Sequence, residues 1–121
     1  MNALFIFIGG GLGSLMRYAI NIFSAKYISN GFPFSTLISN FLACSLLGIV
    51  TVMIIPKHTD SSWIHPLFVV GVCGGFSTFS TFSSETLDLF QSGHTFLGML
   101  NIIISIGTCL GILYLTQLSA K

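Results

Sequence analysis

Charge is scarce in this sequence: four lysines and arginines and three acidic residues make up 6% of its 121 residues, with a net charge of +1. Soluble domains carry about 25% charged residues, whereas 53% of this chain is hydrophobic and its mean hydropathy is +0.93. So little charge excludes a soluble domain, and it excludes nucleic acid as a partner, because binding phosphates needs a basic surface. The composition predicts an integral, multi-pass membrane protein that is surrounded by lipid.

Cysteine is also rare, and the three cysteines each lie inside an apolar block: Cys44, Cys73 and Cys109. None belongs to a CxxC pair, so the pattern favours small packing residues over a disulfide or a zinc site. A cleavable signal peptide is not expected, because the first apolar run has no basic leader and continues into Arg17 instead of a small-residue cleavage site.

Four apolar blocks are separated by a connection at 28–34, a polar loop at 56–62 and a turn at 91–94. A membrane-spanning helix needs roughly 20 apolar residues, and each block meets that length: 4–27, 35–55, 66–90 and 96–118. We therefore predict an all-α membrane protein with a single four-helix transmembrane domain over 1–121. An even number of spans places both termini on the same side.

The basic residues are divided almost equally between the two sides of the predicted bundle. Lys57 and Lys121 lie on the side of the termini, whereas Lys26 and, more deeply, Arg17 lie on the other. Orientation normally follows a clear excess of Lys and Arg on the cytoplasmic side. The absence of such an excess predicts that the chain inserts in both orientations and pairs with itself antiparallel. Alternatively, the N-terminal amine or a partner subunit decides the orientation.

Glycines recur four residues apart in three blocks, at 9 and 13, 71 and 75, and 107 and 111. Small residues at this spacing let membrane helices approach closely, so we expect tight packing within or between subunits. The run at 9–13 (GGGLG) lacks the GxGxxG spacing of a dinucleotide-binding loop.

The third block contains a polar segment at 74–85, GGFSTFSTFSSE. Two glycines permit backbone conformations that break a helix, and irregular backbone survives at membrane depth only when it is buried in protein or lines a water-filled path. A broken helix offers free carbonyls to a cation and free amides to an anion, and phenyl ring edges carry positive partial charge. We therefore predict a broken third helix that forms a pore or binding site with weak, multi-site binding.

Other polar side chains lie within the apolar blocks. Arg17 either extends to the interface, attracts an anion at a vestibule, or pairs with Glu85, which could instead cap a half-helix. Asn40 carries an amide donor that could contact an anion or bond across helices, and Thr36 lies one turn before it. Ionisable groups at such depth are usually functional.

The fourth block carries hydroxyl and amide groups at i, i+4 and i+7: Asn101, Ser105 and Thr108. This spacing places them on one helical face. They could form a track of donors beside a permeation path, which we favour, or the hydroxyls could bond to their own helix backbone.

Three motifs together resemble the Fluc (CrcB) fluoride channel family, and the resemblance extends over the whole chain. They are 10–18 (GGLGSLMRY), 36–40 (TLISN) and the very specific 74–85 (GGFSTFSTFSSE). The resemblance implies an antiparallel, dual-topology dimer with two pores for passive fluoride efflux, which would give fluoride resistance. It implies that the following residues line the fluoride pathway: Phe79, Phe82, Asn40, Ser105 and Thr36.

The resemblance also implies a structural sodium ion at the dimer interface, held by backbone carbonyls of Gly74 and Ser77 from each subunit. Structural or electrostatic roles are implied for Arg17 and Glu85. Some relatives in this family work as paired, non-identical subunits, but the balanced charge here favours a homodimer.

Departures from the family pattern fall at a few positions. Ser77 stands where the family often has threonine, which a carbonyl ligand tolerates. Ala43 and Cys44 replace a frequent Gly-Ser, and Cys109 occupies the place of a second hydroxyl one turn after Ser105.

An alternative class is a small multidrug-type, proton-coupled exporter, but that needs a membrane-embedded carboxylate in the first block, which has none. A non-transporting assembly subunit would not need a broken, hydroxyl-rich helix.

Overall fold

The computed structural model describes residues 1–28, 31–58 and 62–119, and all regular structure in them is helical. Four stretches are long and apolar enough to cross a membrane: Asn2–Tyr27, Phe34–Lys57, His65–Gln91 and Thr95–Leu118. The predicted all-α organisation with four spans is thereby confirmed. Two predicted features, the middle of the 56–62 loop (59–61) and Lys121, lie outside the described residues.

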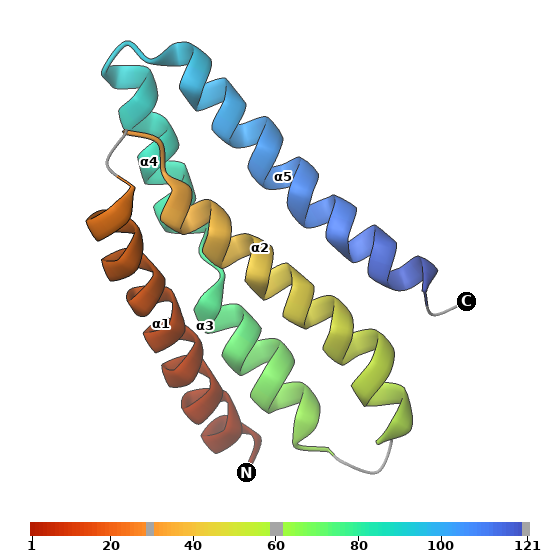
Figure 1. Ribbon diagram of the computed structural model, residues 1–121. Helices are drawn as coiled ribbons and strands as arrows, with labels where there is room; N and C mark the ends of the chain where they lie inside the picture. The colour runs from red at the N-terminus through yellow and green to blue at the C-terminus, as the bar shows by residue number, and fades with distance from the viewer. Residues whose placement is uncertain (29–30, 59–61, 120–121) are drawn as a thin grey trace.

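Each span runs antiparallel to the one before it (Figure 1). The first is α1 (Asn2–Tyr27), and the last is α5 (Thr95–Leu118). The second consists of α2 (Phe34–Ile49), a π-type segment η1 (Val50–Ile54) and a short 3-10 turn η2 (Ile55–Lys57). The third is divided into η3 (His65–Cys73, π-type), α3 (Gly74–Phe76) and α4 (Phe79–Gln91).

The turn between α4 and α5 has a local cause in the sequence. Gly93 adopts φ +82°, a left-handed conformation that glycine reaches without steric cost. The His94 amide then donates to the carbonyl of Leu89 at 2.9 Å, which satisfies one of the free carbonyls at the end of α4. The predicted turn at 91–94 therefore follows from one glycine, and it holds α4 against α5.

Close helix packing follows the glycine pairs in the first and third spans. A side chain at Gly9 would collide with the Leu67 carbonyl oxygen, and one at Gly13 would collide with the Val72 carbonyl oxygen. These contacts bring α1 directly against η3 and α3, the most extensive packing between elements in the described chain. The expected role of this glycine pair is confirmed, because each glycine faces backbone of the third span.

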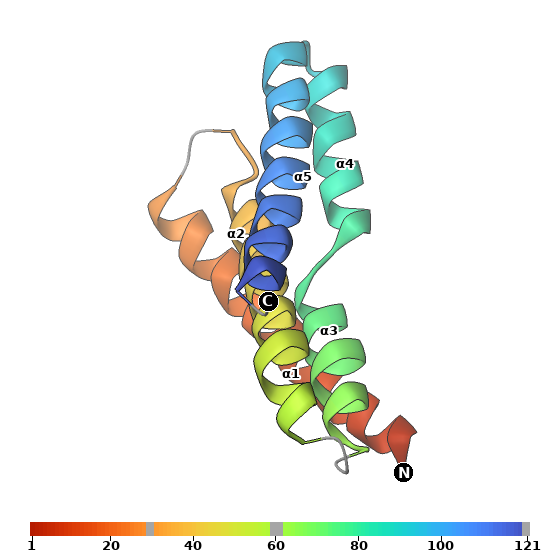
Figure 2. The same ribbon diagram turned by 90° about the vertical axis from the view of Figure 1, so that its right-hand side faces the viewer.

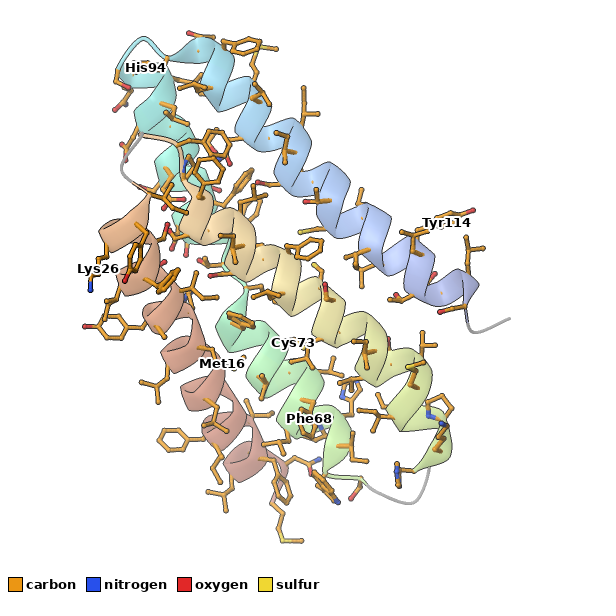
Figure 3. All side chains as sticks on the ribbon, in the orientation of Figure 1. Met16, Lys26, Phe68, Cys73, His94 and Tyr114 are labelled. Carbon is orange, nitrogen blue, oxygen red and sulfur yellow. The ribbon has the colours of Figure 1, made fainter. Side chains whose placement is uncertain are left out.

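Many large apolar side chains point outward from the bundle, as expected for a surface that faces lipid. Leu15, Phe23 and Leu110 are each more than 60% exposed, and Tyr114 projects away from α5 (Figure 3). On α5, the space beside Gly107 and Gly111 is open to a distance of 4 Å within the described chain. This glycine pair therefore makes no close contact inside the described part of the subunit.

Candidate functional site

The third span is interrupted at Ser77 and Thr78, where the backbone becomes extended (Figure 2). Ser77 has φ −74° and ψ 156°, and Thr78 has φ −150° and ψ 117°. The broken helix was predicted, but its cause is different from the one expected. Gly74 and Gly75 remain within the helical segment α3, and a side chain at Gly75 would instead meet the backbone of Gly10. That glycine serves close packing against α1.

Asn40 on α2 stabilises the extended segment with two hydrogen bonds. The Thr78 amide donates to Asn40 Oδ1 at 2.7 Å, and Asn40 Nδ2 donates to the Thr78 carbonyl at 3.3 Å. In a continuous α-helix the Thr78 amide would donate to the carbonyl of Gly74. Asn40 thus replaces the helical partners of Thr78, and the Gly74 carbonyl loses its helical donor.

Thr78 also begins the helix α4. Its hydroxyl oxygen accepts a hydrogen bond from the Thr81 amide at 3.2 Å and donates to the Thr81 hydroxyl at 3.0 Å. A threonine at this position satisfies one of the free amides of a helix N-terminus. The other first-turn amides of α4 keep their partial positive charge at the break.

An open pocket of about 280 Å³ lies at the N-terminus of α4, between α2 and α5. It brings together five of the residues predicted to form the site, and its full lining is Asn40, Cys44, Ser77, Thr78, Phe79, Phe82, Ser105, Ile106, Cys109 and Leu110. Among the residues that the structure describes, no basic or acidic side chain lines it. The pocket can therefore offer hydrogen-bond donors and ring edges to an ion, without a full opposite charge.

The two phenylalanines of the pocket differ in their surroundings. Phe79 is 80% exposed, whereas Phe82 is only 8% exposed, and their ring centroids are 5.9 Å apart with the planes tilted by 41°. Phe82 is thus fixed within the subunit. Phe79 projects from it, at the edge of the pocket.

Ser105 is connected to Phe82 by a chain of buried hydrogen bonds that crosses from α5 to α4. The Ser105 hydroxyl donates to Asn101 Oδ1 at 3.3 Å, Asn101 Nδ2 donates to Thr86 Oγ1 at 2.8 Å, and Thr86 Oγ1 donates to the Phe82 carbonyl at 2.7 Å. Asn101 is 1% exposed. Thr86 was not predicted from the sequence; its position one turn after Phe82 is the only signal that could have indicated it.

The remaining predicted residues lie outside this pocket. Thr36 is buried on α2, one turn from Asn40. Thr108, expected in the donor track, bonds instead to its own helix at the Ile104 carbonyl, 2.6 Å away; for this residue the track was wrong. Gly74 is exposed beside the break.

The two ionisable residues predicted to support the site also lie apart from it. Arg17 is half-buried on α1. Glu85 lies in a separate hollow beside Asp88, and its Oε2 atom is buried without a hydrogen-bond partner among the described residues. Its predicted pairing with Arg17 is therefore not made through that oxygen, and the roles of both residues stay predictions.

These features define a class of protein: a multi-pass helical membrane protein whose third span breaks midway, beside an uncharged, largely apolar pocket that contains a few hydrogen-bonding groups. Residues 4–117 match a family described as CrcB-like protein, Camphor Resistance (CrcB). The chain belongs to the CrcB/FluC fluoride ion channel family.

Relatives of full length support this assignment. The chain is 38% identical over 121 residues to the fluoride-specific ion channel FluC of Ruminiclostridium cellulolyticum, covering 100% of this chain and 93% of that protein. It is also 38% identical over 116 residues to FluC of Shewanella piezotolerans (96% of this chain, 93% of that protein). FluC of Clostridium perfringens strain 13 is 38% identical over 119 residues (98% and 93%).

Proposed function

We propose that this chain forms a fluoride-specific channel that lets fluoride leave the cell passively and so protects it from fluoride. One observation carries the proposal: an uncharged pocket at a helix break lies within a membrane-spanning bundle, and its wall combines the Asn40 amide, the Ser105 hydroxyl and the rings of Phe79 and Phe82. The full-length relatives, each named as a fluoride-specific ion channel, support the same function.

The chemistry of the pocket suits a small anion that accepts hydrogen bonds. An asparagine amide has two N–H donors; Asn40 uses one on the Thr78 carbonyl, which leaves one for fluoride. The Ser105 hydroxyl can rotate from Asn101 toward the ion. The first-turn amides of α4 add partial positive charge, and the ring edges of Phe79 and Phe82 contribute the same.

Several weak contacts favour conduction over tight binding. A single cationic side chain would hold fluoride strongly and slow its release, whereas successive donors and ring edges let the ion move from one to the next. The ion sheds part of its water on entry, and donors along the path replace it. Larger halides would fit a narrow path less well and would accept weaker hydrogen bonds. Thr36, one turn before Asn40 on α2, would lie at the entrance to this path.

We further propose that two copies assemble antiparallel into a dual-topology homodimer with two pores. Two features of the subunit support an interface beside the break: the Phe79 ring is 80% exposed, and α5 carries the unfilled surface beside Gly107 and Gly111. Small residues at this spacing favour close approach of helices in a membrane. In the dimer, Phe79 would complete a pathway wall that a single subunit leaves open.

Backbone carbonyls at the end of α3 fit a structural sodium ion at that interface. Hard cations bind oxygen ligands, and the Gly74 carbonyl is available because the Thr78 amide donates to Asn40. Ser77 lies in the extended segment, outside any helix. Gly74 and Ser77 of each subunit would hold the ion, which would supply a central positive charge that joins the two breaks.

The runner-up function, a proton-coupled multidrug exporter, lacks its essential group. Such a carrier exchanges protons at a carboxylate inside the first span, and the sequence of α1 contains no aspartate or glutamate. The passive channel is therefore the better supported function.

Replacing Phe82 tests the proposed pathway. We expect Phe82→Ile to reduce fluoride flux strongly, because an aliphatic side chain has no positive ring edge, while the dimer stays assembled. The measurement is fluoride efflux from reconstituted liposomes, with size-exclusion chromatography to monitor assembly. Phe96→Ile is the matched control, since Phe96 is 74% exposed at the start of α5 and does not line the pocket. An unchanged rate in Phe82→Ile would remove the ring from the mechanism.

A further inference from the structure

Two of the three cysteines line the pocket at the helix break, one from each of two neighbouring helices. Cys44 lies one turn after Asn40 on α2, and Cys109 lies one turn after Ser105 on α5. The two helices pack against each other, and both thiols line the pocket at the helix break. The sequence alone had favoured inert packing for all three cysteines.

The third cysteine has a different environment. Cys73 is buried at 5% exposure within the third span, where its label in Figure 3 marks it near the middle of the bundle, and it does not line the pocket. Cys44 and Cys109, by contrast, are partly exposed. The chain therefore contains two partly exposed thiols in the pocket and one buried thiol outside it.

We propose that Cys44 and Cys109 form a two-thiol binding site for soft metal ions, and that an ion held there closes the fluoride path. Soft ions such as Hg(II), Ag(I) and Cu(I) prefer thiolate ligands, and the first two are commonly held by two sulfurs in a line. The predicted effect of the site on fluoride flux rests on the proposed function, whereas metal binding to the two thiols does not.

The binding step is a simple exchange of ligands. Mercuric chloride is uncharged and enters the membrane; on binding, each thiol gives up its proton, two sulfur–mercury bonds form, and two chloride ions leave. No electron is transferred, so no oxidant is required. The bound metal would occupy the pocket one helical turn from the donors of Asn40 and Ser105, and it would obstruct the ion that those donors guide.

The test uses the full chain in lipid, with mercuric chloride as the probe and Cys73→Ala as the reference protein. We compare it with versions that also carry Cys44→Ser, Cys109→Ser or both, because serine keeps the size and polarity of the pocket wall. Two measurements are made: the number of mercury atoms that stay bound per chain after desalting, by elemental analysis, and the mercury concentration that halves fluoride efflux from liposomes.

In the reference protein we expect one mercury per chain and block of efflux. Either serine substitution should raise the blocking concentration about a hundredfold, because a second linked ligand strengthens binding by that order, and the double substitution should abolish both binding and block. The proposal is wrong if the double variant still binds mercury or is still blocked, or if each single variant behaves like the reference protein. If the reference protein binds one mercury per chain but conducts no fluoride, the thiol site stands and the channel function fails.

Discussion

Asn40 is the residue on which the site's geometry depends most. Its amide forms both hydrogen bonds that hold Thr78 in an extended conformation, and the residue lines a pocket in which no described residue places a charged side chain. One side chain therefore maintains the helix break and, in our account, contacts the ion. A substitution that keeps the shape of the Asn40 side chain but changes its charge should therefore distinguish contact with the ion from a role in packing alone.

Asn40→Asp should impair fluoride flux severely. The carboxylate still accepts from the Thr78 amide, but it cannot donate to an anion when ionised, and its negative charge repels fluoride. Liposome efflux gives the rate, and a normal elution volume on size exclusion shows that the protein is still assembled. A rate equal to that of the unaltered protein would take Asn40 out of the permeation path.

Thr86 and Asn101 illustrate what residue patterns cannot predict. Asn101 was expected on a polar face of the last span, and it does lie there, but its amide is buried and donates to Thr86 on a neighbouring helix. A threonine inside a helix usually bonds its own backbone, and Thr86 does that as well. Its role as the acceptor for Asn101 depends on how α4 and α5 pack together, and the residue pattern of neither helix predicts that packing.

At the scale of helices, α1 is held to the third span through glycines. Gly9 and Gly13 have neighbouring backbone where a side chain would lie, and this packing runs along η3 and α3 up to the break. Because interiors are tightly packed, a single added methyl group forces neighbours to move. The position of the break should therefore depend on glycines that never touch the ion.

Gly13→Ala should destabilise the protein by about 1–3 kcal/mol, the usual cost of overpacking. The added methyl group would meet the Val72 carbonyl oxygen and lie 2.7 Å from the amide nitrogen of Phe76. Gly11→Ala on the same helix is the matched control: it has open space within the described chain, and alanine favours helix by about 1 kcal/mol. Thermal unfolding in detergent compares them, and equal melting temperatures would contradict the packing account.

The sequence predicted the helices better than the exact position of the break. Four spans followed from apolar length alone, and an interruption near residues 74–85 followed from polar side chains that lipid cannot satisfy. The glycines at 74 and 75 were expected to cause the break, but they stay helical, and the break lies at Ser77 and Thr78 within the predicted segment. The cause is a contact with Asn40, 38 residues earlier, and such long-range contacts are absent from local patterns.

For the molecule as a whole, the distribution of charge is the feature that bears on assembly. Lys26 lies in the last turn of α1 and projects away from the bundle (Figure 3), whereas Lys57 lies at the far end of the second span, on the other side. By sequence position, Arg17 belongs to the same half as Lys26, and Lys121, which lies outside the described residues, is expected on the side of Lys57. Because orientation follows a basic excess on the cytoplasmic side, this balance predicts that the chain inserts both ways.

Removing one lysine at a time should fix the orientation. Lys26→Gln leaves the excess on the side of the termini, and Lys57→Gln leaves it on the other, so the two variants should insert in opposite directions. Each variant alone should lose fluoride resistance in a sensitive bacterial host, and coexpression should restore it, because an antiparallel pair needs both orientations. Full resistance with either variant alone, despite a fixed orientation of a C-terminal reporter, would contradict the antiparallel dimer.

The most direct measurement of the central claim is ion efflux from liposomes that contain the purified protein. Fluoride and chloride are loaded separately, a selective electrode follows each, and protein-free liposomes give the background. The account predicts rapid fluoride efflux and chloride efflux at the background rate, since the pocket provides close donors and ring edges for a small anion. Equal efflux of the two halides, or fluoride efflux no faster than in protein-free liposomes, would contradict it.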